Sequence, residues 1–589
     1  MLRTDEANAP LIQTAHRLRP ALVVSFLFPL LAGLPFLQKP FHIDDPLFVW
    51  AAQHITQDPL NFYGFHVNWY GYLMPMHEAT QNPPLFSYML APVGRALGWH
   101  ERPFHLVVLG FAGMAGLIGY LIAQRWTRYP LAAALFASAS PAVLVSSTTV
   151  MCDIPMYALW LASVYLWLRG LETLGLSFYD LRSYAQSSVQ PPPAPVRTHA
   201  AVYFLFSGLC TICAVLTKYV ALSLFPLLAL LTVLHGRRAL PWLSMLIVPL
   251  CGVLLYEFYT KHLYGTGLIA FAFGYASERT GVVQGVAWSK LYTTLCFVGA
   301  LYPVILVVPF LGSTRRRALF CTLFTAIATA GIFFWLRTTP ANSNKELGLV
   351  MQQAVWTVSG AVSVIFAGGW IARLFTIRSL KTGIALRRVE LFLGLWFLGV
   401  FVFAGWVSHM VNARMLVPMA LPLAILLTRF FESQTKPIAA YSFLCSLTLV
   451  LALMVGYADY SLATSAKRAA ETIMGREREG TVWFCGHWGF QYYMETLGAK
   501  PLDADHPEIK TGDYYVVPSN NTNVFAIPEV YVNETREHIF PVCSFLTTMQ
   551  PRMGAGYYSD VWGKLPFVFG TVPAEQYVVQ RIGQTGGLP

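Results

Sequence analysis

Two adjacent carboxylates follow the first apolar segment of the chain. That segment runs from Arg19 to Leu37, and Asp44 and Asp45 come shortly after it in the sequence FHIDDP. Ionisable groups at the edge of a bilayer are costly, and those found there usually have a partner or a function. Because a carboxylate can accept the proton of an attacking hydroxyl group, the pair predicts general-base chemistry at a membrane surface.

Three more charged side chains stand at the ends of apolar segments. Asp153 begins one such segment, Lys218 lies between two others, and Arg414 opens another. Asp153 taken alone is equally typical of a helix N-terminal cap. A lysine at this depth is also explained by a side chain that extends to the membrane surface. Together, the two cations and the carboxylates suit an anionic lipid phosphate that carries a group to be transferred.

Such a transfer assigns an expected role to each of these side chains. Asp44 would act as the base that deprotonates an acceptor hydroxyl group. Lys218 and Arg414 would stabilise the negative charge that develops on the leaving phosphate. Asp45 and Asp153 would raise the pKa of the base by like-charge proximity, or orient the acceptor.

A long polar and aromatic loop, 39–103, carries the acidic pair. Its first part, Pro46 to Gln53, predicts a short amphipathic helix. His77, Glu78 and Asn82 follow in the same loop, and we expect them to contact the acceptor or to shape the loop.

The composition identifies the class of protein that must position these residues. Of 589 residues, 56% are hydrophobic and only 12% are charged, and the mean hydropathy is +0.52. A chain this apolar is typical of a polytopic α-helical membrane protein with room for one soluble domain. The net charge of +11 is explained by arginines that orient membrane helices, so it does not indicate a nucleic-acid partner.

Apolar windows of membrane-spanning length predict about thirteen transmembrane helices within residues 1–456. They begin near residues 20, 104, 130, 153, 200, 219, 239, 291, 317, 355, 389, 413 and 438. Basic residues gather in alternate loops, and the loops between them hold most of the acidic residues. The positive-inside rule then places the N-terminus in the cytoplasm and the loop 39–103 outside. The stretch from Gln186 to Pro195, rich in proline and serine, is expected to be a cytoplasmic linker.

The composition changes after Tyr457, and an odd number of spans places residues 457–589 outside the membrane. Ala458 to Met474 predicts a helix; the strand–helix–strand pattern that follows, over 481–485, 489–497 and 513–518, predicts a small α/β domain. Cys485 and Cys543 lie in this domain, and the sequence leaves open whether they form a disulfide. His487, beside a tryptophan in a predicted turn, is better explained by a structural role than by catalysis.

These features together resemble the GT-C superfamily of membrane glycosyltransferases. The likeness is to bacterial relatives of dolichyl-phosphate-mannose–protein mannosyltransferases and of the lipid A aminoarabinose transferase. It covers residues 1 to about 456, and more weakly the C-terminal domain, where the sequences ADY and GHWGF are also similar to the family. The residues that carry it are the acidic pair in HIDDP, the segment from Asn82 to Leu85, Asp153, Lys218-Tyr219 and Ala413-Arg414.

The resemblance implies an inverting transfer from a polyprenyl-phosphate-linked sugar, with the first acidic residue of the pair as base. It also implies an integral protein of a bacterial inner membrane, with its site on the outer face. The expected acceptor is a hydroxyl group or a phosphate, on a lipid, a polysaccharide or a protein. Gln81 and Asn82 stand where the aminoarabinose transferase has an acidic residue and a lysine. That difference removes a metal ligand, so a requirement for a divalent metal is not established, although His77 and Glu78 lie near enough in sequence to replace it.

Two other classes of protein fit parts of the pattern. A transporter or flippase of a lipid-linked or anionic substrate would also have many helices and intramembrane charges. It would more often show repeated halves and charges in the middle of its spans, whereas here the charges gather at one face. A scaffold would not need the acidic residues on the outer face.

Overall fold

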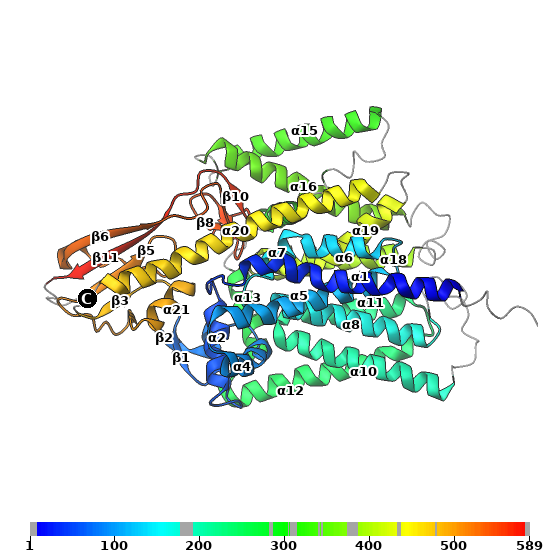
Figure 1. Ribbon diagram of the computed structural model, residues 1–589, viewed down its shortest axis with the longest axis horizontal. Coiled ribbons are helices and arrows are strands. Elements are labelled where there is room, and N and C mark those ends of the chain that lie inside the picture. The colour runs from blue at the N-terminus through cyan, green and yellow to red at the C-terminus, as the bar shows by residue number, and fades with distance from the viewer. Residues whose placement is uncertain are drawn as a thin grey trace, which may run out of the picture.

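The computed structural model describes residues 9–176, 193–281, 287–303, 306, 315–339, 342, 345–373, 387–432, 438–476 and 480–583. Figure 1 shows a bundle of long helices and, at one end of it, a smaller domain built around a sheet. The expected linker between Gln186 and Pro195 lies largely outside the described residues.

The helices of the bundle and of the connecting loops follow one another along the chain. In chain order they are α1 (Ala9–Gly33), η1 (Leu34–Phe36), α2 (Asp45–Ile55), α3 (Met76–Ala79), α4 (Leu85–Leu97), α5 (Glu101–Ala123), α6 (Pro130–Ala139), α7 (Pro141–Ser146), α8 (Asp153–Thr173), α10 (Ala194–Thr217), η2 (Tyr219–Ser223), α11 (Leu224–Leu234), η3 (Leu240–Leu246), α12 (Ile247–Tyr264), α13 (Leu268–Gly281), α14 (Ala287–Leu301), α15 (Arg315–Thr338), α16 (Leu347–Ala372), α18 (Arg388–Val402), η6 (Phe403–Val407), η7 (Ala413–Met419), α19 (Ala420–Glu432) and α20 (Ile438–Arg476).

The chain is an integral membrane protein by the length and composition of these helices. Within the described residues, eight helices are long and apolar enough to cross a membrane, and four apolar helices are shorter. Each of the thirteen predicted starts lies in or next to a helix. Several of the predicted spans are interrupted, because proline cannot donate the backbone hydrogen bond that a continuous helix needs. Pro141, for example, separates α6 from α7.

The loop 39–103 is folded rather than extended. It contains α2, where the sequence predicts a short amphipathic helix, and then a hairpin of β1 (His66–Asn68) and β2 (Leu73–Pro75). The two helices α3 and α4 complete it before α5 begins. The acidic pair therefore stands at the entrance to a compact subdomain and not on a free loop.

The C-terminal domain is an α/β structure, as the sequence predicts. A five-stranded sheet has the order β4-β3-β5-β11-β6, and β3 runs parallel to both of its neighbours, while β11 pairs antiparallel with β5 and β6. The strands are β3 (Val482–Phe484), β4 (Lys500–Pro501), β5 (Tyr514–Pro518), β6 (Val532–Phe540) and β11 (Glu575–Ile582), and α21 (Trp488–Thr496) follows β3. Two short pairs complete the domain: β7 (Leu546–Thr547) with β10 (Val568–Phe569), and β8 (Met549–Gln550) with β9 (Ala555–Gly556).

One long helix joins the bundle to the sheet. α20 has 39 residues, and it continues without a break past Tyr457, where the composition changes. The predicted domain boundary between residues 456 and 457 therefore lies inside a helix (Figure 1). Asp459 is completely buried on this helix.

The C-terminal domain packs closely on the loop 39–103. The backbone N–H of Phe41 donates to the hydroxyl of Tyr493 at 2.7 Å, and that hydroxyl donates to Glu101 at 2.7 Å. Gly489 approaches the same turn so closely that a Cβ there would lie 1.8 Å from the Phe41 carbonyl oxygen. Residues of the C-terminal domain thus fix the position of the segment that precedes the acidic pair.

Candidate functional site

Asp44 precedes the first residue of α2 and follows a strained residue. Ile43 has φ of 48°, in the left-handed region that a β-branched side chain rarely adopts. Such strain persists only where the surrounding structure fixes it, and it is concentrated at functional sites. The Asp44 side chain makes no capping hydrogen bond to the helix and keeps 29% of its surface exposed. Part of this carboxylate is therefore accessible to another group.

Asp45 differs from its neighbour because it is completely buried. Its Oδ2 accepts a hydrogen bond from the backbone N–H of His42 at 2.9 Å, which closes the turn around Ile43. Burial raises the pKa of Asp45 to about 7, partly opposed by the nearby Lys39 ammonium. A like-charge effect of Asp45 on Asp44 stays a prediction; what the structure shows is that Asp45 closes the turn before Asp44.

Asp153 is the first residue of α8, and Cys152 occupies the cap position before it. The Asp153 side chain is completely buried, and it forms ion pairs with Lys218 and, at 3.6 Å, with Arg414. A cap at the end of a helix would not need two cations. The structure therefore favours the interpretation of Asp153 as part of a charged site.

Breaks in two helices place the cations. Lys218 has an extended backbone between the end of α10 and the start of η2, so its side chain leaves the helix axis and reaches Asp153. Arg414 is the second residue of η7, which begins where the Asn412 side chain accepts a hydrogen bond from the N–H of Met415 at 2.9 Å. Each cation forms an ion pair: Lys218 with Asp153, and Arg414 with both Asp44 and Asp153.

Four charged side chains, far apart in sequence, are brought together. Arg414 lies 3.4 Å from Asp44 and 3.6 Å from Asp153, and Asp153 also pairs with Lys218. The two carboxylates and two cations balance one another, and Asp44 is the most exposed of the four. The arrangement joins a carboxylate that is accessible to solvent to a buried arginine and a largely buried lysine.

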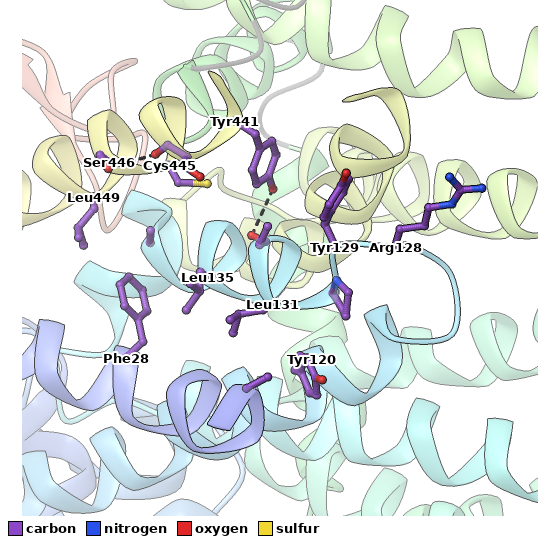
Figure 2. A pocket seen from close by; sticks show the side chains of 15 residues that line it. Phe28, Tyr120, Arg128, Tyr129, Leu131, Leu135, Tyr441, Cys445, Ser446 and Leu449 are labelled. Atoms are coloured by element: carbon purple, nitrogen blue, oxygen red, sulfur yellow. Dashed lines mark hydrogen bonds between the residues drawn. The ribbon is translucent and has the colours of Figure 1, made fainter. Parts of the chain in front are cut away.

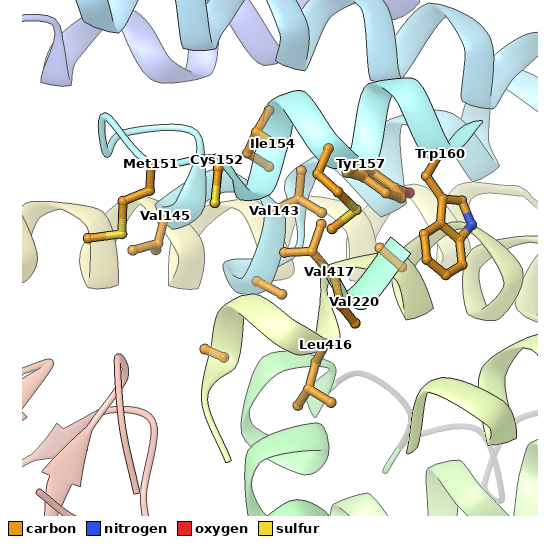
Figure 3. Packing of buried hydrophobic residues seen from close by; sticks show 14 of the residues in the cluster. Val143, Val145, Met151, Cys152, Ile154, Tyr157, Trp160, Val220, Leu416 and Val417 are labelled. Carbon is orange, nitrogen blue, oxygen red and sulfur yellow. The ribbon is translucent and has the colours of Figure 1, made fainter. Parts of the chain in front are cut away.

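Apolar packing surrounds the charged side chains. Figure 3 shows buried residues from α7, α8 and η7 that pack together, among them Val143, Ile154 and Leu416. The interior they form has a low dielectric constant, in which ion pairs are stronger and unpaired charges are costly. Removing one of these charges should therefore lower the stability of the protein strongly, because its partner is left unpaired in this interior.

Of the three residues predicted to contact the acceptor or shape the loop, only Asn82 lies next to the charged site. Asn82 is next to the site, since its Oδ1 accepts a hydrogen bond from the Sγ of Cys152 at 3.6 Å. His77 stacks on Tyr264 of α12 with ring centroids 4.7 Å apart, and its Nε2 lies 3.8 Å from Glu78. Burial lowers the pKa of His77. His77 and Glu78 therefore line the α12 side of the loop, and a role in acceptor contact stays a prediction.

A second buried cluster was not predicted from the sequence. Asp459 of α20 pairs with Lys39 and accepts hydrogen bonds from the hydroxyl groups of Tyr558 and Thr548, each at 2.6 Å. His42 lies 3.8 Å away, and burial lowers its pKa to about 4, so its imidazole is neutral. A signal existed only for Asp459, an aspartate within the similar sequence ADY on a helix that continues from an apolar span.

Two further sequence interpretations can be compared with the structure. His487 is buried, stacks on Trp69 at 5.2 Å and contacts Gln491, which agrees with a structural role. Cys485 and Cys543 are both buried and free, with no disulfide between them. Among the described residues, no group of three or more His, Cys, Asp or Glu side chains is arranged to hold a metal ion.

An apolar groove of about 540 Å³ lies within the membrane part, bounded by α1, α6 and α20. Figure 2 shows its lining, in which Phe28, Leu131, Leu135 and Leu449 are apolar and Arg128 stands at one end. No predicted site residue lines it.

Comparisons with known proteins give structural similarity but no family. No family model matches the chain, and no curated protein matches it. A structure of the oligosaccharyltransferase AglB from Archaeoglobus fulgidus, with an inhibitory peptide and a dolichol-phosphate, shares 13% identity at a TM-score of 0.45. The match covers 83% of this chain and 65% of AglB, so the chain spans less than two thirds of that protein.

The chain is also similar to ArnT from Cupriavidus metallidurans. In its apo state ArnT shares 14% identity at a TM-score of 0.36, over 99% of this chain and 100% of ArnT. A structure of ArnT bound to undecaprenyl phosphate shares 13% identity at a TM-score of 0.36, over 84% of this chain and 92% of ArnT. AglB and ArnT are GT-C glycosyltransferases, the superfamily that the sequence motifs resemble.

Proposed function

We propose that the protein is an inverting GT-C glycosyltransferase that moves a sugar from a polyprenyl-phosphate-linked donor to an acceptor on the outer face of the membrane. The observation that carries the proposal is the ion-paired group of Asp44, Asp153, Lys218 and Arg414. It supplies a partly exposed carboxylate, a buried arginine and a largely buried lysine in one site. A glycosyl transfer from a lipid phosphate needs both the carboxylate and the cations.

The proposed step assigns one role to each group. Asp44 takes the proton of the acceptor hydroxyl as its oxygen attacks the anomeric carbon of the sugar. The bond from that carbon to the phosphate oxygen breaks, and polyprenyl phosphate leaves with the electron pair. Lys218 and Arg414 stabilise the negative charge on this leaving group. Attack opposite the leaving group inverts the anomeric configuration.

We assign Asp153 the role of counter-ion to the two cations. It is fully buried and paired with both cations, so it neutralises their charge and does not contact the acceptor. Asp45 similarly acts on Asp44 through the turn that it closes with His42. Only Asp44 of the three carboxylates is exposed enough to serve as the base.

The test uses purified protein in nanodiscs with a short-chain polyprenyl-phosphate sugar. Wild type is expected to bind the donor and to transfer or slowly hydrolyse the sugar. Asp44→Asn should bind with unchanged affinity but lose activity by about 100-fold or more, because the base is absent. Lys218→Ala should weaken donor binding, since it removes a contact with the phosphate.

The matched control is Asp505→Asn, which makes the same chemical change at an exposed aspartate of the C-terminal domain. This variant should keep wild-type binding and activity. If wild type binds no polyprenyl-phosphate sugar, the proposal is wrong, and transport assays become the next test. If Asp44→Asn turns over normally, Asp44 is not the base.

A further inference from the structure

We infer that the segment Tyr557–Asp560 of the C-terminal domain forms part of the donor-phosphate site, with Tyr558 as the residue that positions Arg414. This inference rests on the proposed function, in which Arg414 contacts the donor phosphate. It gives the C-terminal domain a specific task, which its sequence alone does not reveal.

Backbone contacts join this segment to the residues just before Arg414. The N–H of Ala413 donates to the carbonyl oxygen of Tyr557 at 2.9 Å. The N–H of Asp560 donates to the carbonyl of Val411, and the N–H of Val411 donates to Oδ1 of Asp560, each at 2.9 Å. Three hydrogen bonds thus fix the chain from which the Arg414 side chain projects.

The Tyr558 ring contacts the guanidinium group of Arg414. The guanidinium carbon lies 5.3 Å from the centre of the Tyr558 ring, within the range of a cation–π interaction. Both residues are buried, so water does not weaken this contact. An aromatic face limits the orientations that a planar guanidinium can take, which matters for a group that must meet a phosphate.

Tyr558 is itself held in place by the second cluster. Its hydroxyl donates to Oδ2 of Asp459, whose carboxylate also pairs with Lys39 and accepts a hydrogen bond from Thr548. The ring of Tyr558 meets the ring of His42 edge to face at 5.5 Å. Tyr558 therefore contacts Arg414 on one side and the turn that carries the acidic pair on the other.

The test measures the affinity of the full-length protein for geranylgeranyl phosphate in nanodiscs. Tyr558→Leu removes the ring and should weaken binding by about tenfold, since a desolvated cation–π contact is lost. Arg414→Ala should weaken it at least as much. Because Tyr558 acts through Arg414, the double variant should bind no more weakly than Arg414→Ala alone.

Conservative changes separate positioning from stability. Tyr558→Phe keeps the ring and loses the hydroxyl, so it should retain more affinity than Tyr558→Leu. The matched control is Tyr515→Phe, which removes a hydroxyl that donates to the carbonyl of Phe525 elsewhere in the same domain. It should bind the phosphate as wild type does. If Tyr558→Leu does not fold, the same cycle is run with Tyr558→Met, which also lacks the ring.

The outcomes distinguish this inference from the proposed function. If wild type does not bind geranylgeranyl phosphate, the proposed function fails. If wild type binds and Arg414→Ala weakens binding, the proposed function stands. In that case, wild-type affinity in the variant that lacks the Tyr558 ring, or losses that multiply in the double variant, would overturn the inference.

Discussion

Arg414 is the side chain on which the site depends most. It lies within ion-pair distance of Asp44 and Asp153 and against the ring of Tyr558. Its three neighbours come from three different parts of the chain. A single guanidinium therefore contacts the acidic loop, α8 and the C-terminal domain.

Asp153→Asn should lower the stability of the empty protein while leaving its ability to bind a prenyl phosphate. The change leaves Lys218 and Arg414 without their buried counter-ion, which should destabilise the empty protein by roughly 3–5 kcal/mol. A prenyl phosphate then supplies the missing negative charge. Thermal unfolding should therefore show a lower Tm for the empty variant and a larger gain in Tm on adding geranylgeranyl phosphate than wild type shows.

Asp45→Asn is a suitable comparison for Asp153→Asn, because it also changes a buried aspartate to its amide but pairs with neither cation. It should not enlarge the gain in Tm. A smaller ligand-dependent gain for Asp153→Asn than for wild type would mean that Asp153 is needed to arrange the cations rather than to neutralise them.

The four charged site residues could be predicted because each stands at the end of an apolar run, where a charge is conspicuous. The second cluster could not be predicted in this way. Tyr558 lies in a segment without regular alternation, and tyrosine is common in this chain, which has 29 of them. Lys39 resembles an ordinary basic residue at a membrane boundary. Only the fold shows that these residues meet Asp459.

At the scale of elements, the site is built from the ends of helices. Asp44 stands at the start of α2 and Asp153 at the start of α8, while Lys218 and Arg414 lie where helices are interrupted. At these points, side chains can leave the regular helical spacing and converge. Interrupted helices in an apolar bundle are thus the means by which four charges reach one place.

Gly489→Ala tests how the acidic loop is held. A Cβ at this position would lie 1.8 Å from the Phe41 carbonyl oxygen, so α21 or the loop must move. Because Asp44 follows Phe41 closely, we expect transfer activity to fall by about tenfold or more, as small displacements at a reacting centre do. The affinity for geranylgeranyl phosphate, measured in the same preparation, should fall less.

The control is Gly475→Ala in α20, where an added Cβ would meet no atom within 4 Å. Alanine also favours a helix over glycine, so this variant should be at least as stable as wild type. Wild-type activity in Gly489→Ala would show that the contact between α21 and the loop does not position the base.

The elements of the C-terminal domain were predicted unevenly. The strands and helix near residues 481–518 have clear apolar patterns, and the structure contains β3, α21 and β5 there. The long pair β6 and β11 was not predicted, because β6 is largely exposed and carries charged residues that obscure its alternation. The continuity of α20 was also missed, since a change in composition looks like a boundary even where the backbone continues.

At the scale of the whole molecule, the orientation in the membrane is a prediction that can be measured. Asp505→Cys places a thiol on an exposed part of the C-terminal domain. If that domain lies outside, a membrane-impermeant maleimide should label this variant in intact cells. The two native cysteines in this domain are buried, but Cys251 of α12 is exposed, so both variants are made in a chain that carries Cys251→Ser.

The companion variant is Arg128→Cys, at an exposed position on the predicted cytoplasmic side. It should be labelled only after the cells are permeabilised. The reverse pattern for the two variants would invert the topology, and the site would then face the cytoplasm.

The length of α20 affects how rigidly the C-terminal domain is held over the bundle. At 1.5 Å per residue, its 39 residues form a continuous rod of about 58 Å that runs from the bundle to the sheet. A rod leaves the two parts little rotational freedom, in contrast to a flexible tether. The conformational entropy of docking the C-terminal domain is therefore lost once, during biogenesis, and not again in each catalytic cycle.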